Sequence, residues 1–230
     1  MKKLVIKLSK KLVNAGRMVE EGKAYTLLEA IALVKKTSYS KFDGTVETHI
    51  NLDLDLNQPD QNIRITTSLP HGTGKVVRVA VFSTGKVKGA DLSLNDEGIT
   101  QIETGKVKPK VDFDILAAEP SFMPKLAKIA RILGPIGMMP NPKAGTVSEN
   151  LEKLVAELKK GRVELRCEAN APIVHTKIGK VSFSEDQLKE NFETVLKAIK
   201  GAKPQKVDPN WIKSVFLTST MGPSIKVLVD

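Results

Sequence analysis

Residues 46–56 read Val-Glu-Thr-His-Ile-Asn-Leu-Asp-Leu-Asp-Leu, an unbroken alternation of two kinds of side chain. Val, Thr, Ile and Leu occupy every second position, and Glu, His, Asn and Asp occupy the positions between them. Successive side chains of a β-strand point to opposite faces of a sheet. The alternation therefore predicts a long strand that is buried on one face only.

The pattern changes after residues 68–75, Ser-Leu-Pro-His-Gly-Thr-Gly-Lys, which are rich in residues that interrupt regular structure. Short continuous apolar runs follow at 76–82 and 113–118, and such runs are typical of parallel strands covered on both faces. Helical patterns occupy 124–133 and 151–160. This middle segment is therefore expected to be α/β with a parallel sheet.

Residues 159–162, Lys-Lys-Gly-Arg, interrupt the chain again, and strand patterns return on their far side. Capping boxes at Thr26–Glu29 and Ser184–Gln187 each predict the start of a helix, and the second helix places Leu188, Phe192, Val195, Leu196 and Ile199 on one face. The remaining strands are expected at 163–166, 173–181, 212–217 and 225–229.

The two outer segments thus share one kind of structure, and the middle segment has another. We expect a split α/β domain built from residues 1–69 plus 162–230, with residues 70–161 inserted as a second, parallel-sheet domain. The two chain crossings, near residues 69 and 161, would act as a hinge. A single continuous α/β domain is the alternative.

The composition points to a polyanionic partner. Thirty-six Lys and Arg against 26 Asp and Glu give a net charge of +10 and a pI near 9.5, which favours RNA, DNA or an acidic membrane. Residues 1–17 contain six basic side chains and no acid, as an arm that contacts phosphates would. The alternative for residues 1–17 is a solvated tail, and the alternative for the whole chain is a soluble protein that is merely basic. The absence of a secretory segment or an apolar run of 18 residues predicts a cytosolic or organelle-matrix protein.

Several kinds of chemistry are disfavoured. Gly72-Thr-Gly74-Lys75 lacks the first glycine and the final Ser or Thr of a phosphate-binding loop, since Leu69 and Val76 stand there. The three histidines are scattered, and Cys167 is the only cysteine, which predicts a small buried side chain rather than a nucleophile. We expect no catalytic residue, no metal and no cofactor.

Two segments carry unusual loop chemistry. Residues 133–147 place three prolines and three glycines in what we expect to be a helix-free connection, either a functional loop or a crossover that covers the sheet edge. Residues 218–224, Thr-Ser-Thr-Met-Gly-Pro-Ser, form either a plain hairpin turn or a close approach to an RNA sugar edge. Aromatic residues make up only 4% of the chain, so folded RNA is a better target than stacked single strands.

These segments resemble the ribosomal protein L-one family, the protein of the mobile stalk on the large ribosomal subunit. The matching stretches are residues 42–47, 60–64, 69–75, 133–147, 179–183 and 220–223. The resemblance implies two domains, a split domain that binds the stalk rRNA and an inserted Rossmann-like domain that binds no dinucleotide. Residues 84–110 and 203–211 depart from the family pattern, so neither the surface of the middle domain nor the approach to the last strand is carried over.

Carried over motif by motif, the resemblance implies that RNA is bound by Phe42, Thr45 and Glu47, and by Thr220, Met221 and Gly222. The basic residues Lys2, Lys7, Lys41 and Lys180 flank these motifs and would attract phosphates.

The resemblance also implies a function and its partners. The chain would be a constituent of the large ribosomal subunit in the cytoplasm, or of an organellar ribosome, with no membrane partner. It would bind stalk rRNA, help to release deacylated tRNA from the exit site, repress translation of its own mRNA, and be a monomer off the ribosome. The alternative is a free RNA chaperone or rRNA-processing factor of the same fold.

Overall fold

The computed structural model describes residues 9–20, 22–56, 58–168, 170–204 and 207–229. The chain forms two compact units. The terminal unit contains the described residues up to Ile63, Leu69–Gly74, and the described residues from Leu165 on. The middle unit contains Arg64–Ser68 and Lys75–Glu164. The expected α/β fold class is therefore confirmed, whereas the expected boundaries and hinge near residues 69 and 161 stay predictions.

The terminal unit is built on a five-stranded sheet in the order β1-β10-β9-β2-β8. β2 pairs with both β8 and β9 in antiparallel fashion, and β1 pairs with β10 in parallel. The strands are β1 (Ala24–Tyr25), β2 (Thr45–Leu52), β8 (Ile173–Lys180), β9 (Ile212–Ser219) and β10 (Ile225–Val227). Every second residue of β2 is buried, as predicted. The strand ends at Leu52 rather than at residue 56 because both of its neighbours begin there: Asn51 pairs with Ile173, the first residue of β8, and Leu52 pairs with Ile212, the first residue of β9.

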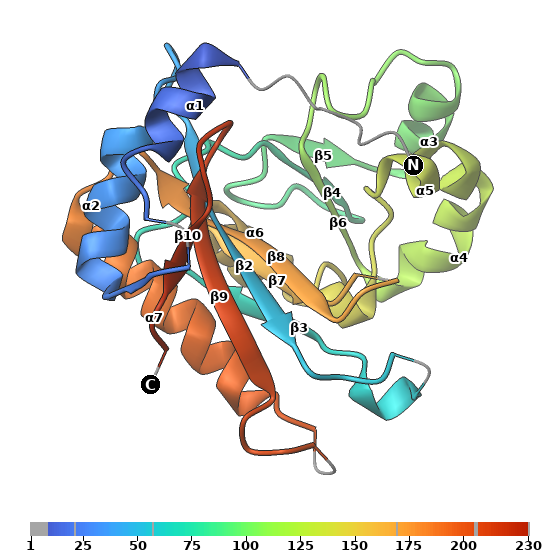
Figure 1. Cartoon of the computed structure of the whole chain (residues 1–230). Coiled ribbons are helices and arrows are strands. Elements are labelled where there is room, and N and C mark those ends of the chain that lie inside the picture. Colours follow the sequence, from blue (N-terminus) through green and yellow to red (C-terminus); the bar gives the residue numbers. More distant parts are fainter. Residues whose placement is uncertain (1–8, 21, 57, 169, 205–206, 230) are drawn as a thin grey trace, which may run out of the picture. The chain divides into compact units, whose positions relative to one another are not determined.

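Two capped helices cover the buried face of this sheet (Figure 1). Both predicted capping boxes are present, at the start of α2 (Leu27–Thr37) and of α7 (Glu185–Gly201). Of the predicted apolar face of α7, only Leu196 is not fully buried. Each buried side chain of this size stabilises the fold by about 1.5–3 kcal/mol. A third helix, α1 (Lys10–Gly16), and the 3₁₀ turn η1 (Pro59–Gln61) complete the unit.

The middle unit has a parallel three-stranded sheet in the order β5-β4-β6, which confirms the predicted topology. Val79 and Val81 of β4 pack toward α6, whereas Ala80 and Phe82 pack toward the other helices. This packing on both faces explains the continuous apolar run. The main elements are β4 (Val79–Phe82), β5 (Leu92–Leu94), α3 (Asp96–Glu103), β6 (Ile115–Ala118), α4 (Met123–Leu126), α5 (Ala130–Ile136) and α6 (Leu151–Lys159).

The predicted helix at 124–133 is interrupted, because a 3₁₀ turn, η3 (Ala127–Ile129), separates α4 from α5. A similar turn, η2 (Pro120–Phe122), precedes α4. The prediction that residues 133–147 are helix-free is wrong. α5 runs through Pro135 to Ile136 and ends at Gly137, whose φ of 75° is the left-handed conformation in which helices often terminate. The 3₁₀ turn η4 (Pro142–Ala144) follows.

The rest of this segment acts as a crossover along the sheet. Val147 pairs in parallel with Ala118, the last residue of β6. Ala118 donates its N–H to Thr146 O at 3.1 Å and accepts the Ser148 N–H at 3.3 Å. Residues 146–148 therefore cover the outer edge of β6, which is the second of the two interpretations open for this segment.

The chain crossings lie at a two-stranded sheet of β3 (Arg64–Ser68) and β7 (Arg162–Arg166). The stretch after β3, Leu69–Gly74, is anchored in the terminal unit by the Asn191 amide. Asn191 is fully buried; it accepts the His71 N–H at 3.1 Å and donates to Gly72 O and Ile178 O at 3.0 and 2.8 Å. The anchor explains why Leu69–Gly74 belongs to the terminal unit although it follows β3.

Candidate nucleic-acid interface

Two threonines that hydrogen-bond to each other join the start of β2 to the end of β9. The Thr220 N–H donates to Thr45 O at 2.9 Å, and the Thr45 N–H donates to Thr220 Oγ1 at 2.9 Å. Lys180, at the end of β8, donates its Nζ to Thr45 Oγ1 at 3.0 Å. Three segments that are distant in the sequence are thus held together at one end of the sheet.

A tight turn follows Thr220. The Gly222 N–H donates to Ser219 O at 2.7 Å, and Tyr39 Oη donates to Met221 O at 2.7 Å. Met221 has a φ of 66°, the left-handed region that residues with a Cβ rarely adopt. The residue is 65% exposed, so core packing does not explain the strain.

Gly222 provides the space that this turn needs rather than a positive φ. The positive φ belongs to Met221, whereas Gly222 is required for space. A Cβ at Gly222 would overlap Ser219 Oγ and would lie 3.2 Å from Ser219 O. Any side chain at this position must therefore displace part of the turn.

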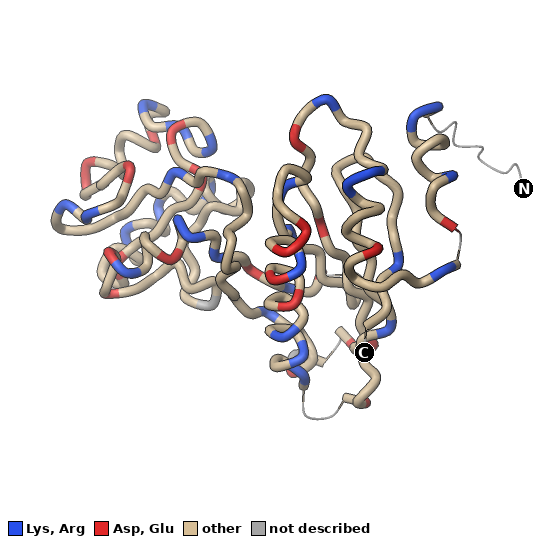
Figure 2. The backbone as a smooth tube through the Cα atoms, turned by 90° about the vertical axis from the view of Figure 1, so that its left-hand side faces the viewer, with Lys and Arg blue, Asp and Glu red and all other residues tan. Residues whose placement is uncertain are grey.

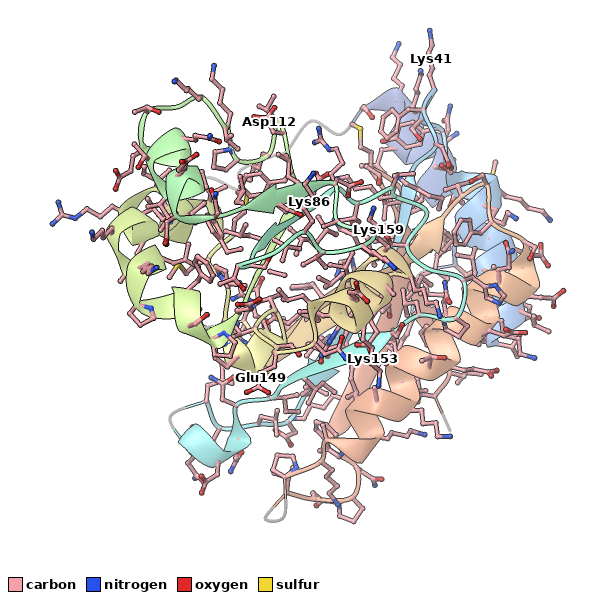
Figure 3. The ribbon with its side chains drawn as sticks, turned by 180° about the vertical axis from the view of Figure 1, so that it is seen from behind. Lys41, Lys86, Asp112, Glu149, Lys153 and Lys159 are labelled. Atoms are coloured by element: carbon pink, nitrogen blue, oxygen red, sulfur yellow. The ribbon has the colours of Figure 1, made fainter. Side chains whose placement is uncertain are left out.

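The loop before β2 presents a second exposed apolar side chain. Phe42 is 58% exposed, and its carbonyl oxygen accepts Ser40 Oγ at 3.0 Å. The loop is fastened by Asp43, which accepts the Ser182 N–H and Oγ at 3.0 and 2.8 Å. Lys41, next to Phe42, extends away from the fold into solvent (Figure 3).

Glu47 lies two residues along β2 from Thr45 and on the same face of the sheet. It is half-buried, opposite Lys177 of β8 and Thr218 of β9. Along the described backbone, basic residues are interspersed with acidic ones (Figure 2). The net positive charge therefore does not by itself mark the candidate interface, which is distinguished by its exposed apolar side chains, Phe42 and Met221, next to the half-buried Thr45 and Thr220.

Eight of the ten predicted binding residues lie in the described part of the terminal unit. Lys2 and Lys7 fall outside the described residues. The sequence reading did not single out Tyr39, Asp43, Lys177 or Ser182, which hold or flank the predicted residues. Two signals were available: Asp43 and Ser182 lie within the matching stretches 42–47 and 179–183, and alternation along β8 puts Lys177 on the face opposite the buried Ile178.

The other candidate chemistries receive little support. Gly72–Lys75 is not followed by a helix, as a phosphate-binding loop would be, and a Cβ at Gly74 would crowd Lys180 and Phe183. Burial raises the pKa of the Cys167 thiol, which keeps it protonated and unreactive. Among the described residues, no group of three or more His, Cys, Asp and Glu could hold a metal ion.

A hollow in the middle unit lies where open α/β sheets bind ligands, beyond the carboxyl ends of β4 and β6. It has a volume of about 340 Å³, and its lining includes Lys86 and Glu149, which Figure 3 labels. Its lining also includes Glu119 and Glu152. Three carboxylates against one lysine would repel a phosphate, so the hollow does not suit a nucleotide.

Across the described ranges, no helix is long and apolar enough to cross a membrane.

Comparison with known proteins identifies the family. The model of the Ribosomal protein L1p/L10e family matches residues 34–223. The large ribosomal subunit protein uL1 of Chloroflexus aurantiacus is 47% identical over 226 residues, covering 95% of this chain and 94% of the relative. The proteins of the same name from Synechococcus sp. (strain CC9605) and Lactobacillus acidophilus are each 44% identical, covering 96% and 95% of this chain and 94% and 95% of the relatives.

These matches extend over both units of the chain and bear out the resemblance of its motifs. The relatives are ribosomal proteins, a structural class without enzymatic activity, which confirms the expectations of a non-enzyme and of a cytoplasmic ribosomal protein. The chain belongs to the ribosomal protein L1p/L10e family and is a structural constituent of the large ribosomal subunit.

Proposed function

We propose that this chain binds the stalk region of large-subunit rRNA through the surface formed by residues 41–47, Lys180 and the turn at 220–222. The observation that carries the proposal is Met221, which is both strained and exposed. A left-handed φ costs a residue with a Cβ about 1–2 kcal/mol. Such strain is retained at functional sites, and here it projects an apolar side chain into solvent.

Each residue of the surface has a role that follows from its chemistry. Met221 and Phe42 would pack against nucleotide faces, since both are large, apolar and exposed. The hydroxyls of Thr45 and Thr220 and the bare backbone of Gly222 would meet ribose and phosphodiester groups.

The charged residues divide into two kinds. Lys41 and Lys180, together with Lys2 and Lys7, would add the attraction to phosphates that weakens with salt. Glu47 repels phosphate, so it would accept a hydrogen bond from a 2′-hydroxyl or a base amine.

Two further roles rest on the same surface. By binding the stalk, the chain would assist release of deacylated tRNA from the exit site. By binding a similar RNA structure in its own mRNA, it would repress its own translation. It would be a monomer off the ribosome. The alternative function, a free RNA chaperone or rRNA-processing factor, shares the fold but predicts no stable place on mature subunits.

Sedimentation separates these functions. The proposed function predicts that the chain co-migrates with intact large subunits in a sucrose gradient and that a Met221→Ala variant shifts toward the free fraction. A chain found only in the free fraction, or only with precursor particles, would favour the alternative.

A deletion locates the site. A variant that lacks residues 75–164, with Gly74 joined to Leu165 by a short flexible linker, retains every residue of the proposed surface and the partners of Asn191. We expect it to bind a stalk rRNA fragment nearly as tightly as the whole chain. If a folded deletion variant bound no RNA, the site would have to include the middle unit.

A further inference from the structure

Two histidines face each other on the sheet surface away from α2 and α7. His49 of β2 is paired directly with His175 of β8. Their Nδ1 atoms lie 2.6 Å apart, and their rings meet edge to face with centroids 4.7 Å apart. The His175 side chain is 42% exposed, so small ions can reach the pair.

A carboxylate lies beside the second ring nitrogen of His175. Glu168 Oε1 lies 3.5 Å from His175 Nε2. This neighbour favours a proton on Nε2 and leaves the lone pair of Nδ1 directed at His49. A carboxylate behind the second nitrogen is the arrangement that usually supports a metal-binding histidine, because it orients the ring and raises the basicity of the ligand atom.

We infer that His49 and His175 form a two-imidazole site for a divalent transition metal of the Zn²⁺ and Cu²⁺ class, with Glu168 as the positioning residue. Imidazole nitrogen suits these ions, whereas Mg²⁺ and Ca²⁺ prefer oxygen. Water would complete the coordination, because the described residues contain no group of three such ligands.

The geometry needs only a small adjustment. Two Zn–N bonds of about 2.0–2.1 Å at a tetrahedral angle place the nitrogens about 3.4 Å apart. The observed 2.6 Å must therefore widen by about 0.8 Å, which side-chain rotation can supply on an exposed face. Without metal, one Nδ1 donates a proton to the other. When the metal binds, the His49 proton moves through solvent from Nδ1 to Nε2, so both rings bind as neutral ligands.

The neighbours of the pair are compatible with an added positive charge. Glu47 and Lys177 form the next cross-strand pair along β2 and β8, and Phe216 of β9 lies on the other side of His49. The opposite charges of Glu47 and Lys177 offset each other, while Glu168 adds a negative charge. The site stands on this geometry alone and does not depend on RNA binding.

The chain has only three histidines, so His71 provides the matched control. The untagged full-length protein is titrated with Zn²⁺ by isothermal calorimetry, and the Cu²⁺-loaded protein is studied by electron paramagnetic resonance, which counts nitrogen ligands. We expect one Zn²⁺ per chain, two nitrogen ligands on Cu²⁺, no heat from Mg²⁺, and wild-type behaviour in His71→Gln.

The variants at the pair test the assignment. His49→Gln and His175→Gln should each weaken Zn²⁺ binding at least tenfold and leave one nitrogen on Cu²⁺, while Glu168→Gln should weaken it about tenfold with two nitrogens retained. Circular dichroism checks that each variant is folded. The proposal is overturned if the wild type binds no Zn²⁺, if His49→Gln binds as the wild type does, or if His71→Gln alone abolishes binding.

Discussion

Replacing Met221 with glycine should separate RNA binding from folding. Met221 adopts a φ of 66° and is 65% exposed. Glycine removes a strain of about 1–2 kcal/mol, while its greater freedom in the unfolded chain costs about 0.5–1 kcal/mol. The free energy of unfolding should therefore stay the same or rise by up to about 1.5 kcal/mol.

RNA affinity should change in the opposite direction. Loss of an apolar contact with a base costs about 1–3 kcal/mol, or about 5- to 150-fold in Kd. The assay is urea denaturation of Met221→Gly together with filter binding to a stalk rRNA fragment. Met221→Ala keeps the Cβ and the strain, so its affinity should fall while its stability is unchanged.

Leu228→Ala is the matched control, because Leu228 is 56% exposed in the same unit but lies outside the proposed surface. It should bind RNA as the wild type does. The reasoning is refuted if Met221→Gly binds RNA with wild-type affinity. It is also refuted if the variant loses more than about 1 kcal/mol of stability, because the Met221 side chain would then stabilise the fold instead of straining it.

The remaining predictions concern the turn, the surface charge and the middle unit. Gly222→Ala should weaken both folding and RNA binding. Adding Ser219→Ala removes the side-chain oxygen that the new Cβ would overlap, so the stability measured by denaturation should recover while the RNA affinity stays low. Recovery of both stability and affinity would exclude a close approach of RNA to Gly222. Lys41→Ala should reduce the slope of log affinity against log salt by about 1 in a salt series, whereas an unchanged slope would mean that Lys41 meets no phosphate. Lys75 and Arg78 lower the pKa of Asp114 to about 2. The difference in unfolding free energy between the wild type and Asp114→Asn should therefore be full above about pH 4 and shrink as the pH falls toward 2. Acid titrations followed by circular dichroism measure this difference, and a difference independent of pH would contradict the prediction.

The parts of the fold that could be predicted from the sequence are those that depend on local sequence patterns. Alternation along residues 46–52 and the capping boxes at Thr26 and Ser184 each depend on neighbours within a few positions, and the structure bears them out. The end of α5 was missed because Gly134 and Pro135 are usual helix breakers. Pro135 is tolerated here in the last turn, and Gly137 ends the helix instead.

The candidate surface was predictable in its composition but not in its geometry. Motif resemblance could name Met221 and Gly222, yet Met is not a residue that favours a left-handed φ, so the strain had no signal in the sequence. The contacts from Tyr39 to Met221 and from Ser182 to Asp43 join positions more than a hundred residues apart. Such contacts depend on strand pairing, which local patterns do not specify.

The position of β2 between β8 and β9 has a consequence for the protein as it is synthesised. β2 is complete at Leu52, but its first neighbour, β8, begins only at Ile173. At a translation rate of about 5–20 residues per second, β2 waits about 6–24 s with both hydrogen-bonding edges unpaired. The middle unit is complete within that interval, at Glu164. Translation order thus allows the middle unit to fold first. The five-stranded sheet of the terminal unit can form completely only after β9 and β10, its last strands in the sequence, have been synthesised.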